Sequence, residues 1–543
     1  MNVYTLPKEL HTVPATPRII ALGVFDGVHI GHRAVLARAL SSHTLSPAVF
    51  TFCGMENVKT GGALQTDEQR RHALELLGFA DVFEGHFDEI RDLSPAAFVD
   101  LLKEKLCAKA IVCGYNFHFG KGGVGDTALL ASLCEQAGIT LHILPAVTAD
   151  GEAVSSTRIK QALANGDIPT VTRLLSRPFT LSTKVVGGEQ RGRTFGAPTI
   201  NQPLTKGIVT PRFGVYATIA IVDGKAMPAV TNIGMRPTVG SPVPLAETYI
   251  LDFESNLYNE TVPVQLVKFL RPEQKFDTVD ALRLQIQKDI ANTAAVFAPQ
   301  GKTRAILFDF DNTLQDREIA TKAYMRRWLQ KHFPTLSDKE LDAHSEALRK
   351  AGEYGFVPYR YMFKKAVELF PDYNGFDFNE LLSFLKVEYP LTTTLFPETI
   401  ETLQKLRDKG YLIGLVTNGN SRIQNCKLDV AGIRSLFDYV LVTGDEGIQK
   451  PDTQPFIRAA LRLGVHPTDC VYVGDNPIND IQGADNAGMK TVFRDLGCEK
   501  FFKYDFTKIT AENAQVEEIC MEKLINREKT VYITSLDELL DIF

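Results

Sequence analysis

The sequence lacks any stretch that could cross a membrane, and it lacks an excess of positive charge. No apolar run reaches the ~18 residues that a spanning helix requires, and the start MNVYTLPKEL has no apolar signal-peptide core. The formal net charge is −6, which gives no reason to expect nucleic acid or an anionic membrane as a partner. Phosphate binding, where it occurs, is therefore expected to depend on local clusters of residues.

Paired cysteines are also missing. The eight cysteines form no CxxC pair, and their spacing indicates neither a zinc site nor a disulfide framework. This usage predicts a reducing cytoplasmic location. There is no low-complexity tract and no short internal repeat, and 543 residues are too many for a single core. The sequence gives no indication of oligomeric state.

What is present is an alternation of short apolar runs with amphipathic stretches over residues 1–175. The runs predicted as buried strands are IIALGVF, AVFTF, KAIVCG and ITLHIL. The stretches predicted as helices are EQRRHALELLG, SPAAFVDLLKEKL and TALLASLCEQAG. Strands alternating with helices are typical of a doubly wound parallel sheet, so the first domain is predicted to be Rossmann-like.

Two further domains are predicted from changes in this pattern. Residues 177–297 are rich in Val, Thr, Gly and Pro, with runs such as GVYATIAIV and VPVQLVKFL, which predicts a small antiparallel barrel closed by one helix. The alternation of strands and helices resumes over 303–543. An insert at about 317–395 with few strand signals is predicted to be a helical cap on this third α/β domain.

The first candidate site follows the strand IIALGVF. The strand runs into Asp26-Gly27, and His29, Gly31 and His32 follow as a helix begins. A helix N-terminus presents free N–H groups to anions, and imidazoles three residues apart share one face of the first turn. Two surface histidines are the plainer interpretation. Their position directly after a parallel strand favours a nucleotide site, where they can stabilise a leaving pyrophosphate.

Three segments carry a resemblance across the first domain. In order they are GVFDGVHIGH, CGYNFHFGKGGVGD at 113–126 and VSSTRIK at 154–160. They resemble the HxGH nucleotidyltransferases, and more narrowly the FAD synthetase module of bacterial bifunctional riboflavin kinase/FMN adenylyltransferases. The resemblance implies adenylyl transfer from ATP to FMN, giving FAD.

The same resemblance implies site residues. His29, Gly31 and His32 would hold the ATP phosphates. The other positions implied at the nucleotide and flavin cleft are Asn116, Ser155, Thr157 and Lys160. Lys160 replaces the motif's final arginine and so loses the bidentate fork, and TFCGMEN at 51–57 replaces the family's TFxPHP. A different acceptor, or a degenerate flavin-binding module or sensor, stays an alternative for this domain.

The second candidate site is the stretch GGEQRGRTFGAPTIN at 187–201, which holds four glycines and two arginines. A glycine-rich turn can bind phosphates through backbone amides, here with Gly192 and Arg193. Thr199 and Asn201 are two apart on a strand and so point to the same side, where they can hold Mg²⁺. Glu247 on a later strand can accept a proton from an alcohol. A barrel with an ordinary glycine-rich hairpin is the plainer alternative.

Residues 177–297 resemble riboflavin kinase throughout. The segment GRTFGAPTIN matches its GRxxGxPTAN signature, and PRFGVYA, TNIGMRPT, ETYILDF and LYNETVPVQLVKFLR follow in order. The resemblance implies that Thr199 helps to coordinate Mg²⁺ and that Asn201 acts at the ATP phosphates. It also implies that Glu247 is the base on the ribityl hydroxyl of riboflavin, so that FMN is the product.

The third candidate site begins in ILFDFDNTL, where Asp309 and Asp311 follow a buried strand. Two neighbouring carboxylates repel each other unless a cation lies between them, which predicts Mg²⁺. One carboxylate can attack phosphorus while the other handles the proton of the leaving group. The polar residues at later strand ends are Thr417 and Asn418 in LVTNGN, Lys450 in GIQKPD, and Asp475 and Asp480 in VGDNPIND.

These segments, in this order, resemble the four motifs of the haloacid dehalogenase-like hydrolases. The resemblance implies that Asp309 forms an aspartyl-phosphate, that Asp311 is the acid/base, and that Thr417 and Lys450 steady the phosphoryl group. Mg²⁺ would be held by Asp309, the main-chain carbonyl of Asp311 and Asp475, with Asp480 completing or orienting the site. The expected substrate is a phosphate monoester, and FMN is the favoured candidate. The ribityl-aminopyrimidine phosphate upstream of riboflavin, or general nucleotide and sugar phosphates, are alternatives.

Overall fold

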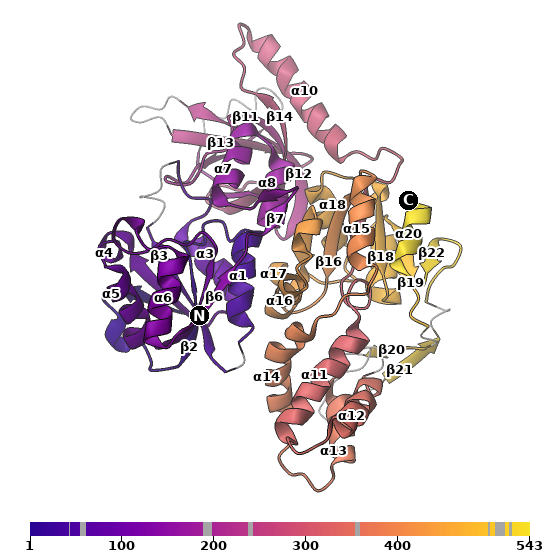
Figure 1. Ribbon diagram of the computed structural model, residues 1–543. Helices are drawn as coiled ribbons and strands as arrows, with labels where there is room; N and C mark the ends of the chain where they lie inside the picture. Colours follow the sequence, from indigo (N-terminus) through magenta and orange to yellow (C-terminus); the bar gives the residue numbers. More distant parts are fainter. Residues whose placement is uncertain are drawn as a thin grey trace. The chain divides into compact units, whose positions relative to one another are not determined.

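The computed structural model describes residues 1–42, 44–54, 61–187, 198–236, 243–352, 359–497, 500–504, 516–520 and 524–543. The chain forms two compact units (Figure 1). The first comprises Met1–Gln300 with Phe437–Val440 and Ile457–His466, and the second comprises Gly301–Leu436, Leu441–Phe456 and Pro467–Phe543. No helix in the described part of the chain is both long and apolar enough to cross a membrane.

The first unit begins with a parallel sheet of six strands in the order β1-β4-β3-β2-β5-β6. The strands are β1 (Asn2–Leu6), β2 (Arg18–Leu22), β3 (Ser46–Cys53), β4 (Asp81–His86), β5 (Ala108–Gly114) and β6 (Thr140–Leu144). The helices are α1 (Ile30–Leu40), α3 (Asp67–Leu77), α4 (Phe87–Ile90), α5 (Pro95–Asp100), α6 (Thr127–Ala137), α7 (Ser156–Asn165) and α8 (Ile168–Leu175).

Strand β2 explains why this sheet is covered on both faces. Its residues Ile20 and Leu22 belong to one hydrophobic cluster, whereas Ile19 and Ala21 belong to another. Because successive side chains of a strand point to opposite faces, the two clusters lie on the two sides of the sheet. A parallel sheet buried on both faces is the doubly wound architecture, and the predicted fold of this part is confirmed.

The remainder of the first unit is an antiparallel sheet in the order β10-β13-β12-β11-β14-β9. The strands are β9 (Thr180–Lys184), β10 (Ile200–Pro203), β11 (Gly214–Val222), β12 (Lys225–Arg236), β13 (Val243–Ile250) and β14 (Thr261–Pro272). The two edges approach each other just beyond β9, where the Val186 amide donates a 2.8 Å hydrogen bond to the Asn201 carbonyl. The sheet is thus nearly closed into the predicted barrel, and helix α10 (Val279–Phe297) packs against β11 and β12.

The second unit contains a six-stranded sheet in the order β17-β16-β15-β18-β19-β22. The strands are β15 (Ala305–Phe308), β16 (Leu412–Thr417), β17 (Tyr439–Val442), β18 (Cys470–Gly474), β19 (Lys490–Arg494) and β22 (Thr530–Ile533). Strand β15 is paired in parallel with β16 and β18. The helices in this part of the chain are α15 (Thr399–Asp408), α16 (Ser421–Ala431), α17 (Thr443–Glu446), α18 (Gln454–Arg462, of which residues 457–462 belong to the first unit), α19 (Gly483–Asn486) and α20 (Leu539–Ile542).

Between β15 and α15 the described residues form four α-helices, and Figure 1 shows them grouped together. They are α11 (Arg317–His332), α12 (Asp338–Lys350), α13 (Tyr359–Leu369) and α14 (Phe378–Glu388). They have their own hydrophobic core around Trp328, the single tryptophan of the sequence. A separate strand pair, β20 (Lys500–Tyr504) and β21 (Val516–Cys520), follows β19. The predicted α/β domain with a helical cap is therefore confirmed as a fold class.

Candidate functional sites

The first candidate site is the turn between β2 and α1. His29 is the N-cap of α1, and its Nδ1 atom accepts a 3.2 Å hydrogen bond from the His32 amide. The two imidazole rings are stacked with centroids 3.6 Å apart. A Cβ atom at Gly31 would lie 3.2 Å from the His29 ring, so glycine is what leaves room for this arrangement. Both imidazoles are thus gathered at a helix N-terminus, which favours anion binding.

Helix α7 meets the same turn through Lys160. The Lys160 ammonium lies 3.4 Å from the buried carboxylate of Asp26, so an ion pair joins α7 to the turn between β2 and α1. Ser155 caps α7 by accepting a 3.2 Å hydrogen bond from the Arg158 amide, and Thr157 is exposed in the first turn of the helix. The lysine that replaces the expected arginine is therefore positioned by an acidic partner beside the histidine turn.

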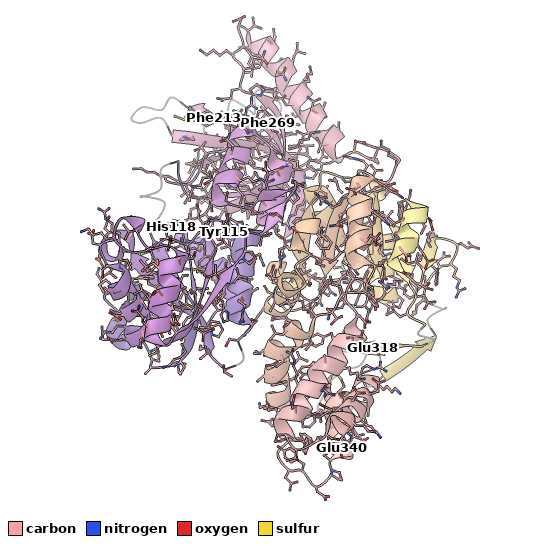
Figure 2. All side chains as sticks on the ribbon, viewed as in Figure 1. Tyr115, His118, Phe213, Phe269, Glu318 and Glu340 are labelled. Atoms are coloured by element: carbon pink, nitrogen blue, oxygen red, sulfur yellow. The ribbon has the colours of Figure 1, made fainter. Side chains whose placement is uncertain are left out.

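Asn116 lies in the loop after β5. Its carbonyl oxygen is 3.0 Å from the Nδ1 atom of His118. Tyr115, directly before Asn116, and His118, two residues after it, are labelled in Figure 2, and the Tyr115 side chain is half exposed. An exposed aromatic ring and an amide at the carboxyl end of a parallel strand occupy the edge where α/β sheets bind ligands.

The second candidate site is organised by the register of the barrel. Glu247 on β13 is paired with Asn201 on β10 on one side and with Asn232 on β12 on the other. Directly opposed residues of antiparallel strands share a face of the sheet, so one carboxylate and two amides form a row across three strands. The buried Oδ1 atom of Asn201 has no hydrogen-bond partner among the described residues. Such an acceptor suits an oxygen ligand for Mg²⁺.

The other residues predicted for this site are only partly placed. Thr199 directly precedes β10, and its carbonyl oxygen is 3.5 Å from the Asn201 Nδ2 atom. Gly192 and Arg193, predicted to bind phosphate, lie outside the described residues. Asn232 was not predicted from the sequence, although the family-like segment TNIGMRPT contains it.

A second carboxylate, also unforeseen, lies near Glu247. A Cβ atom at Gly234 would come within 1.9 Å of the Glu273 Oε1 atom, so the Glu273 carboxylate covers this glycine. Gly234 is two residues after Asn232 on β12 and therefore shares the face that bears Glu247. Burial and the charge of Glu247 raise the pKa of Glu273. The barrel site thus carries two carboxylates, and the charge of Glu247 affects the pKa of Glu273.

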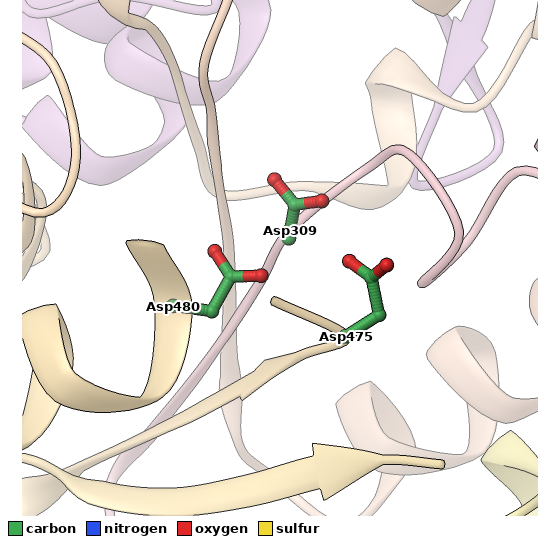
Figure 3. Close-up of side chains that lie close together, drawn as sticks. All are labelled: Asp309, Asp475 and Asp480. Atoms are coloured by element: carbon green, nitrogen blue, oxygen red, sulfur yellow. The ribbon is translucent and has the colours of Figure 1, made fainter. Parts of the chain in front are cut away.

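The third candidate site gathers three carboxylates at the carboxyl edge of the second unit's sheet (Figure 3). Asp309 follows β15, Asp475 follows β18, and Asp480 lies in the helical turn Pro477–Gln482. Each offers an oxygen, and these oxygens lie within 4.8 Å of one another. All three side chains are buried, so the group is a concentrated negative charge that a divalent cation fits.

Lys450 is the cation present at this cluster. Its Nζ atom lies 2.6 Å from Asp309, 2.6 Å from Asp480 and 2.9 Å from the Tyr472 hydroxyl. Burial alone would lower the pKa of Lys450, but Asp309 and Asp480 raise it well above its usual value. The lysine therefore stays protonated, and one positive charge faces three carboxyl groups.

The pKa values of two carboxyl groups in this cluster are raised above their usual range. Burial raises the pKa of Asp309 to about 7, with Lys450 opposing the shift. Burial, together with the charges of Asp480 and Asp309, raises the pKa of Asp475 well above its usual value. A carboxyl that holds a proton near neutral pH, as Asp309 does, fits a Mg²⁺ site, because the cation would replace that proton.

We expect Mg²⁺ to bind this cluster more tightly as the pH rises through about 7, the pKa of Asp309. The folded protein keeps a proton on Asp309 in a range where a free carboxyl has lost it, and Mg²⁺ must displace that proton. Below this pKa the affinity should fall about tenfold per pH unit. Thermal unfolding with and without Mg²⁺, one unit below and one unit above this pKa, measures the effect. An equal Mg²⁺ shift at both pH values would contradict it.

Asp311 is held apart from this cluster. Its two carboxylate oxygens lie 2.7 and 2.9 Å from the Lys427 Nζ atom, and Gln424 donates a 3.1 Å hydrogen bond to one of them. Gln424 also donates a 2.6 Å bond to the Thr417 hydroxyl. Despite burial, Lys427 lowers the pKa of Asp311. Neither Lys427 nor Gln424 was predicted, although both follow LVTNGN on the next helix.

The last predicted residue of this site, Asn418, joins two of the motifs. Its amide donates a 2.9 Å hydrogen bond to the Lys450 carbonyl and accepts a 2.9 Å bond from the Lys450 amide. This pair of bonds fixes the main chain that carries the lysine. The structure thus brings together Asp309, Lys450, Asp475 and Asp480 directly, and it connects Thr417, Asn418 and Asp311 through side-chain hydrogen bonds.

Three protein-family models match three different parts of the chain. Residues 13–158 match the model of FAD synthetase, residues 175–297 match riboflavin kinase, and residues 306–493 match haloacid dehalogenase-like hydrolase. The two transferase matches cover the parallel sheet and the barrel, and the third covers the sheet that bears the carboxylate cluster.

Individual curated relatives match about half of the chain. A bifunctional riboflavin kinase/FMN adenylyltransferase of Listeria monocytogenes is 33% identical over 292 residues, which are 52% of this chain and 93% of the relative. The Escherichia coli protein of the same description is 35% identical over 298 residues, covering 52% and 95%. Among solved structures, a HAD phosphatase from Thermococcus onnurineus is 26% identical with a TM-score of 0.27, covering 44% of this chain and 97% of that one.

Proposed function

Because this chain belongs to the bifunctional riboflavin kinase/FMN adenylyltransferase family and carries an additional haloacid dehalogenase-like hydrolase domain, we propose that it both makes and hydrolyses FMN. Riboflavin kinase and FMN adenylyltransferase are the activities of the first unit, with ATP as co-substrate. The second unit is a phosphatase. The assignment of FMN as its substrate and of the residues below is the proposal.

In adenylyl transfer, the FMN phosphate attacks the α-phosphorus of ATP and pyrophosphate leaves. We assign His29 and His32 to the phosphate chain, because the stacked imidazoles at the start of α1 can donate hydrogen bonds to the leaving oxygens. Lys160 adds a point charge from α7 without the bidentate geometry of arginine. Asn116 is assigned to the flavin side of the cleft.

In riboflavin phosphorylation, Glu247 is assigned as the general base on the terminal ribityl hydroxyl. The hydroxyl oxygen then attacks the γ-phosphorus of ATP, and ADP leaves. Thr199 and Asn201 would hold Mg²⁺, which neutralises phosphate charge when it is bound. Asn232, opposite Glu247 in the register, is assigned as the residue that orients the carboxylate.

In phosphate hydrolysis, an Asp309 oxygen attacks the phosphorus of the ester and becomes an aspartyl-phosphate. Asp311 gives a proton to the departing ester oxygen and then takes one from the water that releases phosphate. Lys450 neutralises the phosphoryl oxygens. Mg²⁺ held by Asp309, Asp475 and the main-chain carbonyl of Asp311 would draw charge from the same oxygens. The single observation that supports this assignment is the buried carboxylate cluster in which Lys450 contacts Asp309 and Asp480.

The substrate proposal rests on the chain's own chemistry. The barrel domain makes FMN, which is a phosphate monoester of an alcohol, and the phosphatase acts on phosphate monoesters. A cap of four helices with its own core excludes bulk water and suits a small substrate. FMN is therefore proposed, and the ribityl-aminopyrimidine phosphate is the competing outcome of the test.

The test uses the full chain carrying Glu247→Gln, so that riboflavin released from FMN is not phosphorylated again. We expect this variant with Mg²⁺ to convert FMN to riboflavin, and to prefer FMN over the ribityl-aminopyrimidine phosphate by kcat/KM. Asp309→Asn in the same background is the matched control and should release no riboflavin. Preference for the pyrimidine phosphate would mean that the phosphatase acts upstream of riboflavin and not on FMN. If neither compound is hydrolysed, both substrate assignments are wrong.

A further inference from the structure

The hydrogen bonds at the carboxylate cluster engage individual oxygens of each aspartate. The Lys450 ammonium lies 2.6 Å from the Oδ1 atom of Asp309 and 2.6 Å from the Oδ1 atom of Asp480. The Oδ2 atom of Asp480 accepts a 3.0 Å hydrogen bond from the Asn476 amide, so both oxygens of this carboxylate have partners. Asp480 is therefore fixed from two sides, which suits a residue that orients the site.

Asp475 is held through one oxygen only. Asn312 is buried, and its Nδ2 atom donates a 3.0 Å hydrogen bond to the Oδ2 atom of Asp475. Within the described part of the chain, the Oδ1 atom of Asp475 accepts no hydrogen bond. The amide thus leaves one oxygen of this carboxylate for a cation and occupies the other, which is how outer hydrogen bonds orient metal-binding carboxylates.

The backbone at position 312 does not by itself require asparagine. Asn312 has a φ of 61°, in the left-handed region that asparagine tolerates better than most residues. Glycine adopts this conformation at no steric cost. What asparagine adds over glycine at this position is therefore the side-chain amide that reaches Asp475.

We propose that Asn312 makes the phosphatase site prefer Mg²⁺ over Ca²⁺, because its amide occupies the oxygen of Asp475 that Ca²⁺ would need in order to bind both. Ca²⁺ accepts more oxygen ligands than Mg²⁺ and often takes the two oxygens of one carboxylate, whereas Mg²⁺ demands a stricter geometry. The inference rests on the proposed Mg²⁺ site and adds a determinant of its metal specificity.

The test is thermal unfolding of the full chain without ATP, titrated with Mg²⁺ and separately with Ca²⁺, which gives a dissociation constant for each cation. We expect Asn312→Gly to raise the dissociation constant for Mg²⁺ about tenfold, since the carboxylate loses its outer hydrogen bond. The constant for Ca²⁺ should stay or fall, because the second oxygen of Asp475 becomes available. An unchanged ratio of the two constants would overturn the inference.

Two further variants make the comparison specific. Asn259→Gly is the matched control, because Asn259 also has a positive φ, 67°, and lies in an exposed turn before β14 of the barrel. It should change neither dissociation constant. Asn312→Asp keeps the size of the side chain but cannot donate to Asp475, so it should also lower the preference for Mg²⁺. This variant decides the question if Asn312→Gly does not fold.

Asp475→Asn separates the failure of this inference from the failure of the proposed function. If Mg²⁺ raises the unfolding midpoint equally in the wild type and in Asp475→Asn, the cluster is not the Mg²⁺ site, and the proposed metal site is wrong together with the inference. If Asp475→Asn loses the Mg²⁺ effect but both variants at Asn312 keep the wild-type preference, only the inference on metal specificity is overturned.

Discussion

Asp309→Asn should abolish phosphate hydrolysis, lowering kcat by at least about a thousandfold, because an amide cannot attack phosphorus as the carboxylate does. The substitution keeps the size of the side chain. Lys450 retains its 2.6 Å contact with Asp480, so the buried ammonium keeps a partner. The variant should therefore fold, and removal of one of three crowded carboxyls should not lower the midpoint of thermal unfolding.

The measurement is phosphate release by the wild type and the variant, together with FMN and FAD formation by both. Asp429→Asn is a suitable control, because Asp429 is also a buried aspartate paired with a cation, Arg434, and lies away from the cluster. It should keep phosphatase activity. An Asp309→Asn chain that hydrolyses phosphate esters at the wild-type rate would contradict the nucleophile assignment.

Glu247→Gln should lower the rate of FMN formation by about 10²–10⁴-fold, since glutamine cannot take the proton of the attacking hydroxyl. The neighbouring amides of Asn201 and Asn232 stay in register and do not supply a base. Adenylylation of supplied FMN should continue, because the residues assigned to it belong to a different sheet. Separate assays of FMN formation from riboflavin and FAD formation from FMN measure the two effects.

Glu254→Gln is the matched control for this prediction, since Glu254 is exposed beyond the end of β13. It should leave both reactions at wild-type rates. Loss of FAD formation from supplied FMN in Glu247→Gln would refute the assignment of the two reactions to separate sites. His32→Ala is the reciprocal variant, with FAD formation lost and FMN formation kept.

The sequence alone was sufficient to predict the features that depend on the order of strands and helices along the chain. Strand-like runs that end in polar residues predicted the edges at which His29 and Asp309 lie, because the carboxyl ends of parallel strands meet at one edge of a sheet. The change from alternating helices and strands to Val- and Thr-rich runs predicted the barrel. Both inferences need only the period of the hydrophobic pattern and the order of the elements.

The partners of these residues depended on long-range geometry. Glu273 is 26 positions after Glu247, and only the closure of the barrel and a glycine at position 234 bring its carboxylate over that face. Lys427 reaches Asp311 across 116 positions, and neither residue type nor spacing distinguishes it from a solvated lysine of a surface helix. The choice of substrate by the cap also depends on long-range geometry, because side chains from several helices determine it.

The most direct test of a chain that both makes and unmakes FMN is one time course with the wild-type protein, riboflavin, Mg²⁺ and a limiting amount of ATP. FMN should rise while ATP lasts and then return to riboflavin as ATP is exhausted, with phosphate released in step. In Asp309→Asn the FMN should persist or pass on to FAD. FMN that stays constant after ATP is consumed in the wild type would contradict the account.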